Sequence, residues 1–194
     1  CIRGVDPGPV AIIEALKASG VGRLEQERAG LVLSPLYPAA KVRWILENVP
    51  GARERAESGN LLFGTIDSWL VWNLTGGAIH MMDYANAQRT MIFNVHDWTW
   101  DHELLSAFAI PPAMLPEPRP GMGLHAMARI DGMLGEAPIY AVTGDQTAAL
   151  FAHGCFEPGE AKCSYGTSTM PHVFVGPEPR GLSGGLVTVA YAAD

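Results

Sequence analysis

A short apolar run that meets Gly-Asp-Gln and then a helix-forming run constrains the fold of this chain most strongly. Ala137–Val142 favours a strand, Gly144-Asp145-Gln146 a tight turn, and Thr147–Phe151 a helix. Asp145 lies at the junction, where a side chain can project beyond a sheet and where ligands of open α/β sheets collect. Aspartate is also a favoured helix N-cap, so this segment alone leaves capping and catalysis as equal interpretations of Asp145.

The composition places the chain among ordinary globular proteins. It has 194 residues, of which 48% are hydrophobic and 17% charged, enough for one sizeable domain. A net charge of -7 argues against a nucleic-acid-binding face, which needs clustered lysine and arginine. The sequence has no apolar run near the roughly 20 residues that cross a bilayer, so no membrane association is expected. The start lacks the pattern of a secretory signal.

Cysteine and histidine usage argues against a metal held by protein side chains alone. The cysteines are Cys1, Cys155 and Cys163, an odd number without Cys-x-x-Cys spacing. That pattern favours a reducing compartment and disfavours a disulfide framework or a zinc cluster. The six histidines are scattered and form no His-Glu-x-x-His motif. We therefore expect a cytoplasmic protein with no metal ligands of its own.

The remaining segments predict a mixed α/β order. Helical spacing is expected at Pro9–Lys17, Leu24–Arg28, Ala39–Val49, Thr65–Leu74 and Asp101–Ala109. Strands are expected at Leu61–Gly64, Ala78–Met82, Met91–Val95, Ala161–Tyr165, His172–Val175 and Gly185–Ala190. Pro50–Ser58 is predicted to be an exposed charged segment and Asp83–Thr90 a polar turn. Pro111–Pro120 contains five prolines, which exclude a regular helix or a central strand, and it is either a linker or a rigid surface crossing.

Three weaker patterns are better explained by local structure. Gly121–Ala126 fits a loose dinucleotide-binding pattern, but a proline-rich stretch precedes it instead of a strand, which indicates a chance match. Ser164–Thr169 is a hydroxyl-rich turn that could hold phosphate, although taken alone an ordinary turn is the better interpretation. Trp69 and Trp72 lie three residues apart on a predicted helix and are expected in the core.

Three separated stretches form an ordered set. The first is Lys41–Asn48, with a Lys-x-x-Trp core; the second is Leu61–Trp72 followed by Asp83–Asn94; the third is Gly144–Phe151 with Tyr165-Gly166-Thr167. In order and spacing they resemble the FGGY family of carbohydrate kinases, and within it the glycerol kinases. The resemblance runs from about Ala11 to the end of the chain.

The resemblance implies an actin-like, ribonuclease-H-like α/β domain with a mixed sheet. Residues 1–194 are then part of the first domain of a two-domain kinase. The N-terminal phosphate-binding hairpin would precede Cys1, and the C-terminal domain would follow Asp194. The implied reaction is ATP-dependent phosphorylation of a polyol or sugar hydroxyl, with glycerol to glycerol 3-phosphate as the first candidate. Mg²⁺ would come with the nucleotide, and the full-length protein is expected to be a homo-oligomer, either a dimer or a tetramer.

The resemblance also assigns roles to single residues. Asp145 corresponds to the catalytic base, and Gln146 to a residue that hydrogen-bonds the substrate hydroxyls. Gly166 and Thr167 correspond to a turn that contacts the nucleotide phosphates. Leu36 stands where glycerol kinases have an aromatic residue that packs against the substrate and hydrogen-bonds it. Because leucine cannot make that bond, a kinase for erythritol, xylulose or ribulose remains open. A non-catalytic actin-fold binding protein is the alternative from a different class.

Overall fold

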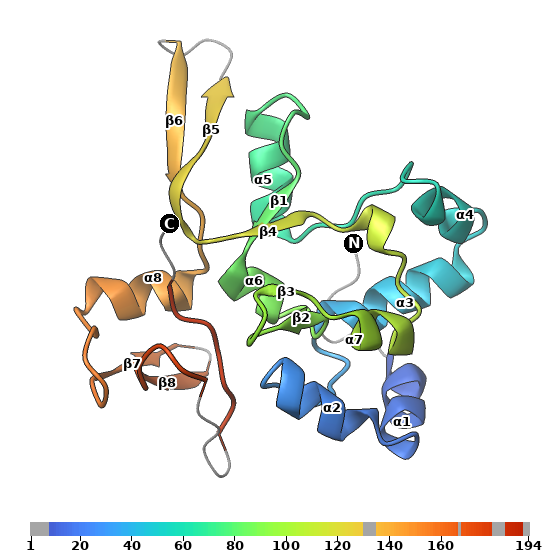
Figure 1. The fold of residues 1–194 in the computed structure, drawn as a ribbon, viewed down its shortest axis with the longest axis horizontal. Helices are drawn as coiled ribbons and strands as arrows, with labels where there is room; N and C mark the ends of the chain where they lie inside the picture. Colours follow the sequence, from blue (N-terminus) through green and yellow to red (C-terminus); the bar gives the residue numbers. More distant parts are fainter. Residues whose placement is uncertain (1–7, 130–134, 167, 180–184, 192–194) are drawn as a thin grey trace.

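The computed structural model describes residues 8–129, 135–166, 168–179 and 185–191 (Figure 1). Within these ranges the helices are α1 (Val10–Ala18), α2 (Val21–Arg28), α3 (Pro38–Asn48), α4 (Ala52–Glu57), α5 (Ile66–Leu74), α6 (Tyr84–Gln88), α7 (His102–Ala107) and α8 (Asp145–Ala152). The 3-10 turn η1 covers Pro112–Met114. The strands are β1 (Met81–Asp83), β2 (Phe93–Asn94), β3 (Thr99–Trp100), β4 (Glu117–Arg119), β5 (Met122–Arg129), β6 (Glu136–Ala141), β7 (Ala161–Tyr165) and β8 (Thr169–Val173).

The strands combine parallel and antiparallel pairing, as a mixed α/β domain requires. In the described ranges they form separate two-stranded pairs: β1 with β4 is parallel, while β2–β3, β5–β6 and β7–β8 are antiparallel. Figure 1 shows the β5–β6 hairpin projecting beside α5, and the β7–β8 hairpin lying next to α8. The strand that leads into α8 is therefore one arm of a hairpin and not a central parallel strand.

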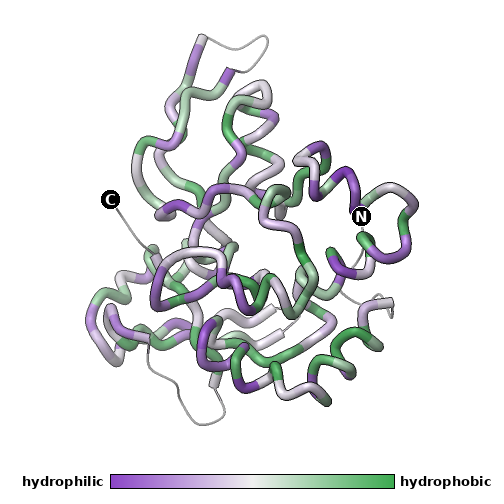
Figure 2. The backbone as a smooth tube through the Cα atoms, turned by 45° about the vertical axis from the view of Figure 1, so that its right-hand side comes forward, coloured by the Kyte–Doolittle hydropathy of each residue, from purple (hydrophilic) through white to green (hydrophobic). Residues whose placement is uncertain are grey.

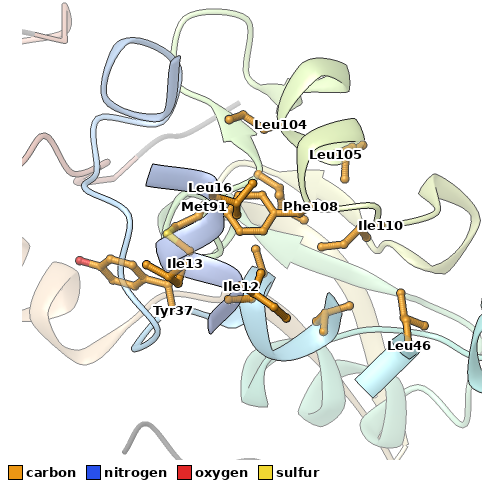
Figure 3. Packing of buried hydrophobic residues seen from close by; sticks show 14 of the residues in the cluster. Ile12, Ile13, Leu16, Tyr37, Leu46, Met91, Leu104, Leu105, Phe108 and Ile110 are labelled. Carbon is orange, nitrogen blue, oxygen red and sulfur yellow. The ribbon is translucent and has the colours of Figure 1, made fainter. Parts of the chain in front are cut away.

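The main hydrophobic core joins the first helices to α7. Ile13 and Leu16 of α1 lie near Phe108, which follows α7, and all three side chains are buried (Figure 3). The apolar spacing at positions 12, 13 and 16 puts one face of α1 toward the core, and Val42 and Leu46 do the same for α3. The buried alanines of α6, Ala85 and Ala87, belong to a second cluster with Met82, Phe93, Val95 and Val189.

Two aspartates begin helices by capping them. Asp101 accepts hydrogen bonds from the backbone N–H groups of Glu103 at 2.9 Å and Leu104 at 3.0 Å, so the predicted helix starts where its acidic residues indicated. Asp83 accepts from Ala85 and Asn86 in the same way. The prediction of a polar turn over 83–90 was wrong, because capping by Asp83 converts the segment into α6.

Some other predictions from local pattern were also wrong. Leu61–Gly64 is not a strand; its Phe63 N–H donates to the carbonyl of Met114 at 2.7 Å instead of joining a ladder. Gly185–Ala190 has no regular structure. Pro50–Ser58, by contrast, is charged and mostly exposed as expected, and it contains α4. The expected placement of the tryptophans fails because α5 buries its other face, Asp67, Ser68 and Val71, leaving Trp69 59% exposed and Trp72 37% exposed.

The segment 185–191 is held against the body of the domain by residues far away in the sequence. Val187 donates its N–H to the carbonyl of Gly30 at 3.1 Å. The buried amide of Gln88 donates from Nε2 to the carbonyls of Val187 at 2.9 Å and Ala29 at 2.7 Å. Gly30 has a φ of +72°, and a Cβ there would lie 2.6 Å from the Cβ of Val187. Glycine is therefore required at position 30 for both conformation and space.

Polar and apolar residues alternate along the chain at short intervals (Figure 2). Among the helices of the described ranges, none combines the length and the apolarity needed to cross a bilayer.

Candidate active site

Four segments distant in sequence enclose a cavity of about 360 Å³. They are α6 with Arg89 after it, the beginning of α8, the strand β8, and the segment 185–191. The volume lies at the lower end of the range for small-molecule sites. The polar side chains in its wall are Asn86, Arg89, Asp145, Gln146, Thr147, His172 and Thr188. A small polar ligand fits this combination of size and lining.

Asp145 is the first residue of α8, and its exposed carboxylate lies in the wall of the cavity. The N-cap is Gly144, whose extended backbone has φ −75° and ψ 156°. The capping interpretation of Asp145 is therefore wrong, because the cap position is already taken by glycine. Oδ1 of Asp145 accepts the backbone N–H of Gln146 at 2.8 Å, while the positive end of the helix dipole favours a negative charge here. The side-chain carboxyl group of Asp145 can thus face a ligand in the cavity.

Gln146 lies beside Asp145 and is held at both ends of its amide. Its Nε2 is 3.5 Å from Oδ2 of Asp145, a long contact, whereas its Oε1 accepts from Nζ of Lys162 at 2.5 Å. Lys162 lies on β7, is 5% exposed, and also donates to Oγ of Ser164 at 2.9 Å. Sequence reasoning missed Lys162. The available signal was the alternation of β7, which places position 162 on the opposite face from its exposed neighbours Ala161 and Cys163.

Basic side chains lie in the cavity wall and next to it: Arg89 and His172 line the cavity, and Lys162 contacts the lining residue Gln146. Arg89 donates from Nη2 to the hydroxyl of Tyr37 at 3.3 Å, and its guanidinium lies 5.0 Å from the centre of the Tyr37 ring. His172 pairs with Lys162 across the β7–β8 hairpin. Burial, together with the charges of Lys162 and Arg89, lowers the pKa of His172 below its usual value, so this ring is neutral at pH 7. The positive charge near the cavity is therefore carried by Lys162 and Arg89 and not by His172.

Asp83 supports the cavity wall from behind. Its Oδ1 accepts from Nδ2 of Asn86 at 2.5 Å, which fixes the cavity-lining Asn86 side chain. Burial raises the pKa of Asp83 to about 6, against the lowering effect of the hydrogen bond from Asn86, and the nearby Asp67 adds to the rise. The segment assigned to local turn chemistry is thus part of the site's framework.

The structure brings some of the predicted site residues together and separates others. Asp145 and Gln146 share the cavity wall. Leu36 is 57% exposed and does not belong to the described wall, whereas the neighbouring Tyr37 is 8% exposed and packs in the core. Leu36 lies in a turn just before α3. Gly166 is exposed after β7 and donates its N–H to the carbonyl of Ser168 at 3.2 Å, away from the cavity wall. Thr167 lies outside the described residues.

The donor set does not suit a metal cage built by the protein. Across the described part of the chain, no group of three or more His, Cys, Asp or Glu side chains is placed to hold a metal ion. Of the residues described in the cavity wall, Asp145 alone carries a carboxylate. Mg²⁺ prefers several oxygen ligands in an octahedral arrangement, so a magnesium ion here would depend on other ligands such as nucleotide phosphates and water.

Comparison with known proteins connects this geometry to a family. A model described as the N-terminal domain of the FGGY family of carbohydrate kinases matches residues 1–152. The glycerol kinase of Halorhodospira halophila is 49% identical over 186 residues, which cover 94% of this chain and 36% of that protein. Glycerol kinase 2 of Clostridium tetani is 48% identical over 188 residues, which cover 95% of this chain and 38% of that protein.

Solved structures agree with the sequence relatives. The Plasmodium falciparum glycerol kinase with ADP has a TM-score of 0.92 at 26% identity, covering 98% of this chain and 38% of that chain. A xylulose kinase from Lactobacillus acidophilus, with a TM-score of 0.74 at 20% identity, covers 87% of this chain and 34% of that chain and shows a shared fold. This chain spans little more than a third of the length of such relatives. With the expected actin-like, mixed α/β fold confirmed, the chain belongs to the FGGY family of carbohydrate kinases.

Proposed function

We propose that this chain is part of the first domain of an ATP-dependent polyol kinase, with glycerol as the first candidate substrate and glycerol 3-phosphate as the product. The observation that carries the proposal is the pairing of Asp145 and Gln146 in the wall of a cavity of about 360 Å³. A carboxylate and an amide side by side are suited to bind a hydroxyl group through hydrogen bonds. The sequence relatives that bear the name glycerol kinase support the choice of substrate.

In the proposed reaction Asp145 is the general base. A hydroxyl of the polyol donates its proton to the Asp145 carboxylate while its oxygen attacks the γ-phosphorus of ATP. The bond between that phosphorus and the bridging oxygen breaks, and ADP leaves with the electron pair. Oδ2 is the better proton acceptor, because Oδ1 is already engaged by the N–H of Gln146 at 2.8 Å. Gln146 positions the hydroxyl groups of the substrate.

The nucleotide is proposed to approach from the turn of the β7–β8 hairpin. Gly166 and Thr167 would contact its phosphates there, since a glycine without a side chain lets the phosphates come close to the backbone. Mg²⁺ would arrive with the nucleotide, held by phosphates and water. The remaining ligands for ATP would come from parts of a longer kinase, of which residues 1–194 would be an incomplete first domain.

A cytoplasmic location is part of the same proposal. Cys155 and Cys163 are both free, which fits a reducing compartment where ATP is plentiful. Self-association of the full-length protein into a dimer or tetramer stays a prediction, to be measured by light scattering.

Asp145→Asn in the full-length protein tests the proposal. We expect kcat to fall by about 10²–10⁴-fold, because the amide cannot accept the proton, while the fold is kept since the side chain is exposed. Glu54→Gln is the matched control: Glu54 is also acidic, exposed and in the first turn of a helix, but lies outside the cavity. Undiminished turnover in Asp145→Asn would refute the assignment of Asp145 as general base. If the unmodified full-length protein consumes no ATP with any of the polyols, a non-catalytic binding protein of this fold is favoured.

The substrate is tested separately. Leu36 is exposed and offers no hydrogen bond, which leaves a different polyol or a ketose as the alternative. ATP consumption with glycerol, erythritol, xylulose and ribulose ranks the candidates by kcat/KM. A clear preference for glycerol excludes the alternative, and a preference for erythritol or a ketose replaces glycerol.

A further inference from the structure

We propose that Lys162 is a positioning residue that fixes the amide of Gln146, so that Gln146 donates an N–H to a hydroxyl oxygen of the substrate. The inference rests on the proposed function and adds to it the direction of the hydrogen bonds between the site and the substrate hydroxyl. It assigns the hydrogen-bond direction of each neighbour: Asp145 accepts from the polyol, and Gln146 donates to it. Nothing in the reaction itself requires this direction, because a free glutamine side chain offers both a donor and an acceptor.

The chemistry of the two partners determines the orientation. An ammonium group carries only donors, so the atom of Gln146 that faces Lys162 must be the carbonyl Oε1. The contact between Nζ and Oε1 is 2.5 Å, short enough for a charge-assisted hydrogen bond. The Nε2 end then faces the other way, and it lies 3.5 Å from Oδ2 of Asp145. The amide N–H groups therefore point toward the carboxylate and the cavity.

The surroundings of Lys162 hold it in this role. Its side chain is 5% exposed, and its described partners are two neutral oxygens, Oε1 of Gln146 and Oγ of Ser164 at 2.9 Å. It forms no ion pair with a carboxylate among the residues that the structure describes. A buried cation without an opposite charge depends strongly on such polar partners. His172, directly across the hairpin, is neutral and does not replace them.

The arrangement creates a selective site for a hydroxyl group. A hydroxyl between Asp145 and Gln146 donates its proton to the carboxylate and accepts an N–H from the amide. This uses its one donor and one of its two lone pairs, and the second lone pair stays free to attack the phosphorus. A substrate lacking that oxygen would leave the Nε2 of Gln146 without a partner, and sites built around such bonds discriminate strongly against deoxy analogues. Lys162 itself does not touch the substrate.

Kinetics of the full-length protein test the inference. In Lys162→Met we expect the KM for the polyol to rise about tenfold or more, with a smaller change in kcat and an unchanged KM for ATP, because the freed amide can present either end. Lys162→Arg should recover much of the affinity, since a guanidinium is also a pure donor. In a Gln146→Leu background the Lys162→Met effect should disappear. Lys17→Met, which changes an exposed lysine on α1, is the matched control.

Gln146→Glu keeps the proposal falsifiable if Lys162→Met fails to fold. The new carboxylate retains the contact with Lys162 but has no N–H, so polyol affinity should fall as far as in Gln146→Leu. Normal polyol KM in a folded Lys162→Met or in Gln146→Glu overturns the inference, as does a Lys162→Met effect that persists without Gln146. Asp145→Asn tests the proposed function independently. If turnover is lost in Asp145→Asn but the polyol KM of Lys162→Met is normal, only the positioning role of Lys162 is refuted.

Discussion

Glu25 of α2 should make the stability of this domain fall as the pH rises. Its side chain is 0% exposed, and neither carboxyl oxygen has a hydrogen-bond partner among the described residues. Burial raises the pKa of Glu25 from 4.5 to about 9, and the charge of Asp101 adds to the rise. The group is thus protonated in the folded protein at neutral pH and ionised in the unfolded chain.

The sign and size of the effect follow from proton linkage. Because the pKa of Glu25 is higher in the folded than in the unfolded state, its contribution to the unfolding free energy is fully present below pH 4.5. This contribution is lost progressively as the pH rises toward 9. The slope is about 1.4 kcal/mol per pH unit, so the loss between pH 4.5 and pH 7 is about 3 kcal/mol. That is a large fraction of a typical folding free energy of about 5–15 kcal/mol.

Glu25→Gln removes the titration while keeping the size of the side chain. The buried amide costs free energy, but by an amount that does not depend on pH. The measurement is urea unfolding of the 194-residue chain at pH 5, 6, 7 and 8, followed by tryptophan fluorescence. The unfolding free energy of the wild type relative to Glu25→Gln should fall by about 4 kcal/mol over this range.

The difference in unfolding free energy between wild type and Glu25→Gln is free of the contributions of other titrating groups. Burial also raises the pKa values of Asp83 and Asp67, and these groups act with the same sign in both proteins. Glu27→Gln, on the exposed side of the same helix, should keep the wild-type slope. Parallel pH profiles for wild type and Glu25→Gln would refute the reasoning, because they would mean that Glu25 is solvated or ionised in the folded state.

Two further predictions concern the contact of segment 185–191 with Gly30 and the activity of the isolated chain. Gly30→Ala should lower the unfolding free energy by about 2–4 kcal/mol, because alanine at this positive φ is strained and its Cβ would lie 2.6 Å from the Cβ of Val187. Gly51→Ala is the control: its φ is +74° but no atom lies within 4 Å, so this variant loses only the free energy of the strained backbone. Equal losses in both variants, measured by urea unfolding, would argue against the overlap. The isolated 194-residue chain should consume no ATP with any polyol, because the proposed site is incomplete; measurable turnover in a coupled assay would contradict this.

Periodicity predicted the helices of the fold better than its strands. α1, α3 and α5 lie where apolar spacing placed them, because a helix satisfies its own backbone and its pattern is local. Leu61–Gly64 and Gly185–Ala190 are as apolar as strands, yet their backbone groups bond to Met114 and Gly30, far away in the sequence. No local pattern records where such partners lie.

The candidate site was predictable to the extent that it is carried by one contiguous motif. Asp145 was singled out from the turn before α8 and Gln146 from the family resemblance, and the structure places both in one cavity wall. Lys162 was missed because the alternation of β7 indicates only which face the residue lies on, while its role depends on the amide of Gln146 that it contacts. The capping interpretation failed by one position, since Gly144 adopts the N-cap conformation without any side chain.

The anchoring of Val187 by Gln88 has a consequence for biosynthesis. The two residues are 99 positions apart, so at about 5–20 residues per second the ribosome delivers Val187 some 5–20 s after Gln88. During that interval the amide of Gln88 is without its later partner, and Asp145 has emerged with one side of its cavity still open to water. The part of the pocket wall that segment 185–191 contributes can therefore form only after the residues of α6 and α8 have been synthesised.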